Sequence, residues 1–291
     1  MINNSLMLYL YDAKLTNPNG DPDEENRPRM DYERSINLVS DLRLKRYIRD
    51  YLLDKGYELY VQKIGDRSVT AEERVKDLKD ANDEEIFKKF IDIRLFGATV
   101  PVKNDNKSFI GPVQFNWGYS LNKVELLEAS ITSTFASKEK NQQGAMGKDY
   151  RVKYSFIAFS GVISGKRAEY VKLTDEDIAL LDEAMKKAIP LQATRSKIGQ
   201  TPRLYLRVEF KDNQTMLNDL RGYIKLAGEE ESLRSIEECA LECGRLKAYL
   251  DQNKDLIAKV YYFKDDELRL LVDGKACSIL DVLAGLQVKE L

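Results

Sequence analysis

The run from Asn17 to Asp31 constrains the fold of this chain more than any other stretch. It reads Asn-Pro-Asn-Gly-Asp-Pro-Asp-Glu-Glu-Asn-Arg-Pro-Arg-Met-Asp, with three prolines and one glycine. Such a run excludes a helix interior and a central strand. An apolar strand is predicted before it at Leu6 to Tyr11, and a long helix after it, beginning near Ser35. The run is therefore a helix-capping connection or a binding loop held at both ends by rigid elements.

The chain of 291 residues contains no histidine, which narrows its chemistry. This excludes histidine general bases, histidine zinc ligands and the nucleophile pairs that depend on histidine. The net charge is −2, so a nucleic-acid surface would have to arise from local segregation of charge. No apolar run is long enough to span a bilayer and the N-terminus lacks signal-peptide features. We therefore expect a cytoplasmic protein with no membrane partner.

Hydrophobic periodicity predicts an α+β order of elements. The first strand is apolar on both faces, so we expect it at the centre of a sheet. The helix after the loop carries an apolar stripe from Leu44 to Leu52. A second helix has a capping pair in Thr174 and Asp177 and is expected to end at Pro190. The other predicted elements are strands at residues 57–64, 129–136, 150–164 and 203–210, a helix at 229–251, and a hairpin of 257–263 with 268–272. This order approximates a β-α-β-β-α-β ferredoxin-like core.

The domain organisation follows from a shift in composition. Residues 65–110 are rich in charge and are predicted to form a helical insertion. The core is then residues 1–64 and 111–291, in a single domain that covers 1–291. Cys239 and Cys243 are spaced four apart, so we expect them on one face of the helix at 229–251 as core residues.

Basic residues gather in three loops that follow predicted strands. Arginine, lysine, hydroxyl and amide groups supply phosphate contacts, and glycine lets a backbone amide approach a phosphate. Trp117 either stacks on a base or fills a joint between subdomains, and Met146 could lie against a base. The candidate nucleic-acid contacts are Asn19, Arg27, Arg29, Arg34, Arg46, Gln114, Trp117, Lys138, Lys140, Met146, Lys148, Arg151, Arg195, Lys197 and Arg203.

The acidic part of the loop suggests a second chemistry. Asp21, Asp23 and Glu25 alternate like calcium ligands, but Pro22 breaks the geometry of an EF-hand loop. No metal and no other cofactor is therefore predicted. A metal-dependent endoribonuclease is the alternative, with Asp21, Asp23 or Asp31 orienting a 2′-hydroxyl or a metal. The loop offers no evident acid–base partner for this chemistry.

Several motifs resemble the backbone subunit of type I CRISPR Cascade complexes, the Cas7 family, and its type I-B branch most closely. The specific motif is Asn17 to Asp23 followed by Asn26 to Asp31. The resemblance covers nearly the whole chain and includes four further segments. They are Arg94-Leu-Phe-Gly-Ala, Gly111-Pro-Val-Gln-Phe, Gly144-Ala-Met-Gly-Lys-Asp-Tyr and Arg195-Ser-Lys-Ile-Gly-Gln-Thr-Pro-Arg.

The resemblance implies a modified RNA-recognition-motif or ferredoxin-like palm with finger and thumb insertions. Identical copies would polymerise head to tail along the CRISPR RNA in a helical filament, beside other Cascade subunits, and the guide would recognise target DNA. Such subunits bind without cutting, so no enzyme activity is expected. Relatives in type III complexes cleave target RNA with an aspartate after the first strand, which keeps the nuclease alternative open. A protein-only scaffold, whose basic loops meet acidic patches of a neighbour, is the other alternative.

Overall fold

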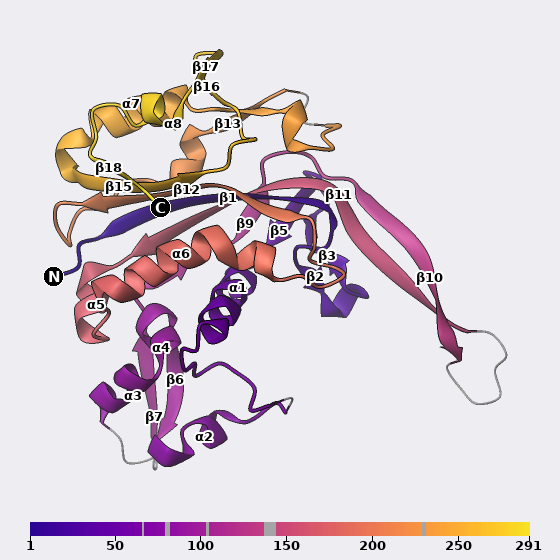
Figure 1. Cartoon of the computed structure of the whole chain (residues 1–291), viewed down its shortest axis with the longest axis vertical. Coiled ribbons are helices and arrows are strands. Elements are labelled where there is room, and N and C mark those ends of the chain that lie inside the picture. The colour runs from indigo at the N-terminus through magenta and orange to yellow at the C-terminus, as the bar shows by residue number, and fades with distance from the viewer. Residues whose placement is uncertain (66, 79–81, 103–104, 137–143, 229–230) are drawn as a thin grey trace.

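A large mixed α/β arrangement surrounds one central sheet (Figure 1). The computed structural model describes residues 1–65, 67–78, 82–102, 105–136, 144–228 and 231–291. Among these residues the sheet has ten strands, in the order β18-β15-β12-β1-β11-β9-β5-β4, and β10 and β8 also pair with β11. Its members are β1 (Ser5–Thr16), β4 (Met30–Asp31), β5 (Ile36–Val39), β8 (Val113–Phe115), β9 (Gly118–Ser120), β10 (Leu126–Ala136), β11 (Gly144–Ile163), β12 (Gln200–Phe210), β15 (Ile257–Lys264) and β18 (Val288–Glu290).

Strand β1 lies at the centre of this sheet, as its sequence predicts. It runs antiparallel to β11 on one side and to β12 on the other, so Leu8 faces Ser160 in one partner and Leu206 in the other. Its even-numbered apolar residues, Leu6 to Leu10, join one buried cluster, and its odd-numbered ones, Met7 to Tyr11, join another. Both faces of the sheet are therefore covered by protein.

Different layers cover the two faces (Figure 1). On one face lie α1 (Asp41–Asp54) and α6 (Asp175–Leu191), whose apolar stripes share a cluster with Tyr9 and Tyr11. On the other face lies a C-terminal layer that shares a cluster with Leu8 and Leu10. That layer contains η3 (Leu220–Tyr223), β13 (Lys225–Ala227), η4 (Ile236–Glu238), β14 (Ala240–Glu242), α7 (Gly244–Gln252), β16 (Leu270–Val272), β17 (Lys275–Cys277) and α8 (Ile279–Val282).

The two helices beneath the sheet begin at side-chain caps. Ser40 accepts a hydrogen bond from the backbone N of Arg43 at 3.2 Å, so α1 begins at Asp41 and not near Ser35. The residues between form β5, which extends the sheet because Leu38 pairs with Tyr119. The capping box of α6 is present as predicted, and the helix ends one residue after Pro190.

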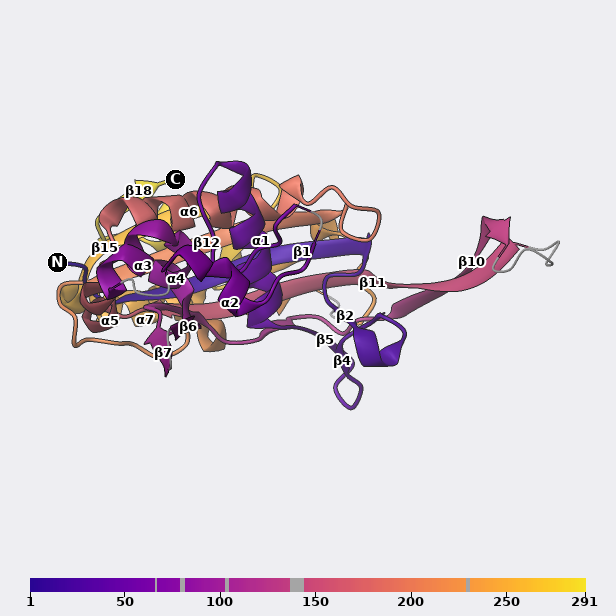
Figure 2. The same cartoon turned by 90° about the horizontal axis from the view of Figure 1, so that it is seen from below.

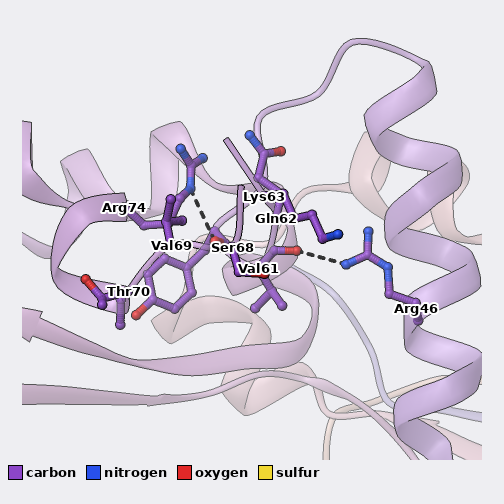
Figure 3. A pocket seen from close by; sticks show the side chains of 10 residues that line it. Arg46, Val61, Gln62, Lys63, Ser68, Val69, Thr70 and Arg74 are labelled. Atoms are coloured by element: carbon purple, nitrogen blue, oxygen red, sulfur yellow. Dashed lines mark hydrogen bonds between the residues drawn. The ribbon is translucent and has the colours of Figure 1, made fainter. Parts of the chain in front are cut away.

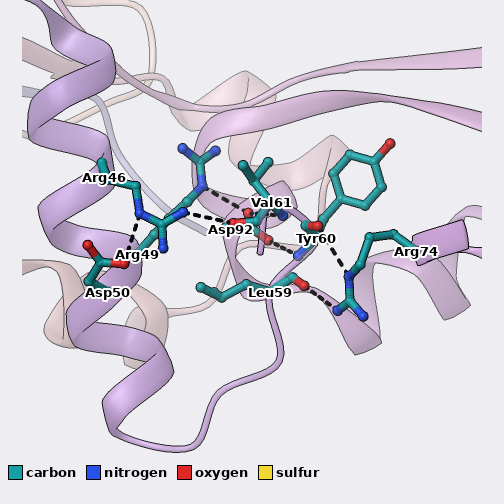
Figure 4. A network of polar contacts seen from close by, with 8 residues as sticks. All are labelled: Arg46, Arg49, Asp50, Leu59, Tyr60, Val61, Arg74 and Asp92. Carbon is teal, nitrogen blue, oxygen red and sulfur yellow. Dashed lines mark hydrogen bonds and ion pairs between the residues drawn. The ribbon is translucent and has the colours of Figure 1, made fainter. Parts of the chain in front are cut away.

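The strand predicted at residues 57–64 is wrong, and side chains explain why (Figure 4). The carboxylate of Asp92, which is 1% exposed, accepts from the backbone N of Tyr60 at 2.7 Å and of Val61 at 3.1 Å. Arg74 donates to the carbonyls of Leu59 and Tyr60. The backbone of this segment is thus satisfied by side chains and needs no neighbouring strand.

The segment after it forms helices and a hairpin beside α1 and α6 (Figure 1). Arg94 holds it to the first turn of α6 through two bonds to Asp177, from Nε at 2.8 Å and from Nη2 at 2.7 Å. The buried pair of Arg49 on α1 with Asp92, at 2.9 Å, makes a second attachment. Its elements are α2 (Ala71–Arg74), η2 (Lys76–Leu78), α3 (Asp83–Lys89), α4 (Ile91–Phe96), β6 (Gly97–Val102) and β7 (Asp105–Ile110). A separate short helix, α5 (Gly165–Tyr170), precedes α6 later in the chain.

The helix predicted at 229–251 is also wrong in its described part. Only α7 is helical for more than one turn, and β14 lies before it, between β13 and β16 of a second, four-stranded sheet. Apolar residues that recur every three or four positions imitate a helix here, but neighbouring strands pair with the backbone instead. Cys239 and Cys243 flank β14 and share no helix face, although both are buried. Burial raises the pKa of Cys243 to about 12.

The predicted C-terminal hairpin is wrong because its two strands belong to different sheets. β15 pairs with β12 and β18 of the central sheet, whereas β16 pairs with β14 and β17. Arg203 of β12 forms ion pairs with Asp265 and Glu267 in the turn between them. This buried arginine holds the chain at the point where it leaves one sheet for the other.

A long arm extends from the sheet and passes beyond the rest of the molecule in both views (Figures 1 and 2). The arm comprises β10 and residues 144–152 of β11, in a register that pairs Glu128 with Tyr150 and Ile131 with Gly147. In the described part of the chain, β11 is the only strand neighbour of β10. Across the residues that the structure describes, no helix is both long enough and apolar enough to cross a membrane.

Candidate nucleic-acid interface

The loop from Asn17 to Asp31 folds into a small hairpin at the end of β1. It contains β2 (Gly20–Asp21), η1 (Pro22–Glu24) and β3 (Arg27–Pro28). Glu25 and Asn26 have φ angles of 51° and 63°, which close the turn. A Cβ at Gly20 would lie 1.9 Å from Oδ1 of Asn26, so only glycine fits beneath this turn.

Two polar contacts attach the hairpin to its neighbours. Oδ1 of Asn19 accepts from the backbone N and the hydroxyl of Ser40, at 2.8 and 2.9 Å, and so orients the cap of α1. Nζ of Lys197 donates to the carbonyls of Asn17 and Pro18, the second at 3.3 Å. The hairpin, the start of α1 and the loop at residues 193–199 therefore meet at one place.

The base of the arm lies against the same hairpin. The guanidinium of Arg27 lies 4.5 Å above the ring of Tyr150 and donates to its hydroxyl at 3.1 Å. That hydroxyl donates to Glu25 at 2.7 Å. Glu128 of β10 pairs with Lys148 at 2.8 Å and with Arg27 at 3.8 Å. Hydrogen bonding from Lys148 lowers the pKa of the Glu128 carboxyl.

A second carboxylate brings the loop at 193–199 to the arm. Asp149 accepts from Nε of Arg151 and from Nη2 of Arg195, both at 2.9 Å. Arg151 also donates to the carbonyl of Leu15 at 2.8 Å. Nearby, Arg29 pairs with Asp21 at 2.7 Å. Three segments that are far apart in the sequence thus place their cations along one edge of the molecule, most of them paired with carboxylates of the same chain.

One pair of cations has no such partner among the described residues. Lys197 donates only to main-chain carbonyls, and the guanidinium of Arg43 lies 4.1 Å above the ring of Tyr47 without any hydrogen-bond acceptor. Burial, and then the charge of Arg43, lower the pKa of Lys197 to about 7. Arg43 was not among the sequence-predicted contacts. The available signal was its spacing of four from Tyr47, which places it beside the apolar stripe of α1.

Other predicted contacts lie elsewhere. The amide of Gln114 is occupied by Lys45 and by the carbonyls of Phe96 and Gly111. Arg203 is buried in its ion pairs with Asp12 and the turn after β15. Arg34 is exposed and forms no ion pair with a described residue. Lys138 and Lys140 lie outside the described residues, and only the backbone position of Met146, opposite Thr132, is described.

Trp117 and Arg46 make their polar contacts with parts of the chain other than the hairpin. Trp117 is 44% exposed between β8 and β9, and its carbonyl accepts from Arg221 at 2.8 Å. Arg46 pairs with Asp50 and donates to the carbonyl of Val61 at 3.2 Å. It lines a shallow pocket between α1 and the segment that follows (Figure 3). The other lining residues include Gln62, Lys63, Ser68, Val69, Thr70 and Arg74.

The arrangement suits a polyanion better than a metal-dependent reaction. Within the described ranges no three acidic or cysteine side chains are grouped so as to hold a metal ion. Asp21 accepts from Arg29 and from the backbone N of Asp23, and Asp31 accepts from the backbone N of Glu33 and Arg34. These carboxylates orient the hairpin, while the cations line the edge.

Comparisons with known proteins agree with one another. Residues 3–244 match the family model described as CRISPR-associated protein Cas7. A protein of Haloferax volcanii, named CRISPR-associated protein Cas7, is 35% identical over 302 residues, which cover 92% of this chain and 89% of that protein. A chain of a pre-nicking CRISPR RNA-guided surveillance complex has a similar fold, with a TM-score of 0.57 and 11% identity over 99% of this chain and 96% of that chain. A chain of a second such complex gives 0.57 at 14% identity, over 99% and 94%.

Proposed function

The chain belongs to the Cas7 family, and on that premise we propose that it is the CRISPR RNA-binding backbone subunit of a Cascade-type interference complex. The observation that carries the proposal is the meeting of the Asn17–Asp31 hairpin, the arm and the loop at 193–199, which aligns cations along one edge. A subunit that binds any guide must hold phosphate and sugar and leave the base edges free for target DNA. Arginine, lysine and backbone amides do this without reading sequence.

The strand order supports a palm like that of RNA-recognition motifs. With α1 and α6 on one face, the order β12-β1-β11-β9 places the first and third core strands at the centre of an antiparallel sheet. We assign β8 and β9, which replace the strand expected at 57–64, to the second core position. Residues 65–110 would then be a finger insertion and the arm a thumb, all within one domain.

The subunit would assemble with identical copies in a head-to-tail filament on the CRISPR RNA, beside other Cascade subunits of a type I-B complex. A helical array needs a contact between two different surfaces of the subunit, repeated from copy to copy without closing into a ring. The arm supports this because it extends past the body with no partner strand other than β11 in the described part.

Replacing Arg27 and Arg29 together by alanine is expected to weaken RNA binding equally for all sequences. Each lost phosphate contact reduces the salt dependence by about 0.7 units for a single strand, so the log–log slope should flatten by about 1.4. Fluorescence anisotropy with two unrelated 30-nucleotide RNAs, measured over a range of salt concentrations, gives the slope.

The matched control removes two exposed cations of the second sheet, Lys225 and Lys275, and so makes the same change in net charge. If both double variants bind RNA as the unmodified chain does, the hairpin is only a helix-capping connection. If the unmodified chain does not bind RNA at low salt, the proposed function is wrong.

We further propose that the subunit holds RNA without cutting it. Labelled RNA incubated with Mg²⁺ or Mn²⁺ should stay intact, because Asp21 and Asp31 are engaged within the hairpin and no histidine is available as a general base. Denaturing gels measure this. Cleavage that disappears in Asp31→Ala or Asp21→Ala would instead establish the endoribonuclease alternative.

A further inference from the structure

Arg43 and Lys197 form a cationic corner that the rest of the chain leaves uncompensated. The corner lies where the first turn of α1 meets the loop at 193–199. No carboxylate of a described residue pairs with either side chain, and Nε of Arg43 is buried without an acceptor. Most other cations of the interface have an acidic partner within 4 Å, as Arg29 has in Asp21.

Leaving two cations together in this way costs free energy. Like charges repel, and a buried guanidinium nitrogen without an acceptor has lost its water. Burial, and then the neighbouring Arg43, lower the pKa of the Lys197 amine to about 7. Tyr11 cannot act as the missing anion, because burial raises the pKa of its hydroxyl well above the usual value. The other titratable groups of the surrounding elements include Asp41 and Tyr47 of α1, Lys14 of β1, Arg195 of the loop and Asp149 of β11; Asp41 pairs with Lys45, and Asp149 pairs with Arg195.

The surroundings of the corner indicate what kind of anion fits. Leu42 and Ile198, which adjoin the two cations in the sequence, are 68% and 66% exposed, and Leu15 at the end of β1 is 50% exposed. Exposed aliphatic side chains beside a pair of cations suit an anion that carries an apolar group. A nucleoside attached to its phosphate has this character, whereas inorganic phosphate does not.

We propose that Arg43 and Lys197 together hold one phosphodiester of the bound RNA, with its nucleoside against Leu42 and Ile198. This rests on the proposed function and adds a site to it. The geometry of α1 supports the assignment, because Ser40 fixes the first turn and Tyr47 holds the guanidinium plane from below. A phosphate would supply the hydrogen-bond acceptor that the guanidinium lacks. It would also be the negatively charged partner that neither cation has.

The site couples binding to a proton. In the free chain Lys197 is partly neutral near pH 7, whereas a bound phosphate favours its charged form. Above this pH, binding must therefore take up a proton, and affinity should fall as the pH rises. Between pH 6 and pH 8.5 we expect a loss of about tenfold. Arginine and lysine side chains with ordinary pKa values stay charged over this range and give no such dependence.

The test measures RNA affinity from pH 6 to pH 8.5 for the unmodified chain and four variants, with a 30-nucleotide RNA at fixed salt. Lys197→Arg keeps its charge, so affinity should stay high and become independent of pH. Lys197→Gln should bind about tenfold more weakly at pH 6 and lose the pH dependence. Arg43→Gln should also bind more weakly, and the midpoint of its profile should move to higher pH because the repelling charge is gone. Lys275→Gln is the matched control and should resemble the unmodified chain.

The outcomes separate the site from the function. RNA binding whose pH profile is the same in the unmodified chain and in Lys197→Arg overturns the site and leaves the proposed function standing. Absence of RNA binding by the unmodified chain overturns both. Inorganic phosphate is the competing ligand, and sulfate is its control. Phosphate could displace RNA from the unmodified chain at about one tenth of the concentration of sulfate, and fail to do so in Arg43→Gln. That result would show that the corner binds the free phosphate ion, and the proposed nucleoside contact would be wrong.

Discussion

A chain whose arm is cut back to the Ile131–Gly147 pair is expected to fold normally and to lose ordered assembly on RNA. The variant replaces residues 132–146 by Asn-Gly, a turn that suits two paired antiparallel strands. The base of the arm, with Glu128, Lys148 and Tyr150, remains in place. Binding to an RNA that accommodates one subunit should change little, while regular polymers on long RNA should disappear.

The physical reason is that the far half of the arm pairs with no described strand of the rest of the chain, whereas its base, which contacts the hairpin, is kept. In the described residues β10 has no strand neighbour except β11, so removing its far half exposes no core. A control variant keeps the length of the arm but replaces residues 144–147 with a Gly-Ser segment. Negative-stain imaging on long RNA, together with thermal melting, measures both effects. Regular polymers formed by the shortened chain would show that the arm is an ordinary exposed hairpin.

Replacing Asp182 by alanine is expected to lower the free energy of unfolding by about 3–5 kcal/mol. Asp182 of α6 is 2% exposed and accepts from Nε of Arg207 at 2.9 Å, from Nη2 at 2.7 Å, and from the hydroxyl of Tyr205 at 2.8 Å. Removing it leaves the buried guanidinium of Arg207 with only the more exposed Glu209, at 3.3 Å, as an ion-pair partner among the described residues. Urea unfolding followed by circular dichroism measures the loss.

The double variant Asp182→Ala with Arg207→Met is the matched control. It removes both charges, so no buried ion is left unpaired and most of the stability should return. A single variant that unfolds at the urea concentration of the unmodified chain would mean that water reaches Arg207. A double variant as unstable as the single one would mean that packing, and not charge, dominates at this position.

The parts of the fold that were predictable are those whose local pattern agrees with their surroundings. Strand β1 is apolar on both faces because protein covers both faces of the sheet there. Helix α6 carries its own start signal in Thr174 and Asp177. The segment at 57–64 has a strand-like composition, but Asp92 and Arg74 bond its backbone from 14 or more residues away. Such distant partners leave no mark on local periodicity.

The candidate site shows the same division. The structure brings together Arg27, Arg29, Lys148 and Arg195, which the sequence analysis placed in segments predicted to be loops next to strands. Arg203 was misplaced by the same reasoning, since an arginine within a strand covered on both faces must find its partner inside the protein. Arg43 was missed, whereas Arg46 of the same helix was a candidate and instead pairs with Asp50 and the carbonyl of Val61. The importance of Arg43 depends on Lys197, which approaches it from a loop 154 residues away in the chain.

Carboxylates of the free subunit would compete with RNA phosphates for the cations of the proposed interface. Asp21, Glu128 and Asp149 pair with the cations that would contact phosphates in the proposed function. An incoming strand must displace them, and each exchange of one anion for another yields little net free energy. Short or transient RNAs would gain almost nothing from such exchanges, while a long strand that makes many at once would bind well. Self-masking of this kind would keep unassembled copies from sticking to unrelated cellular RNA.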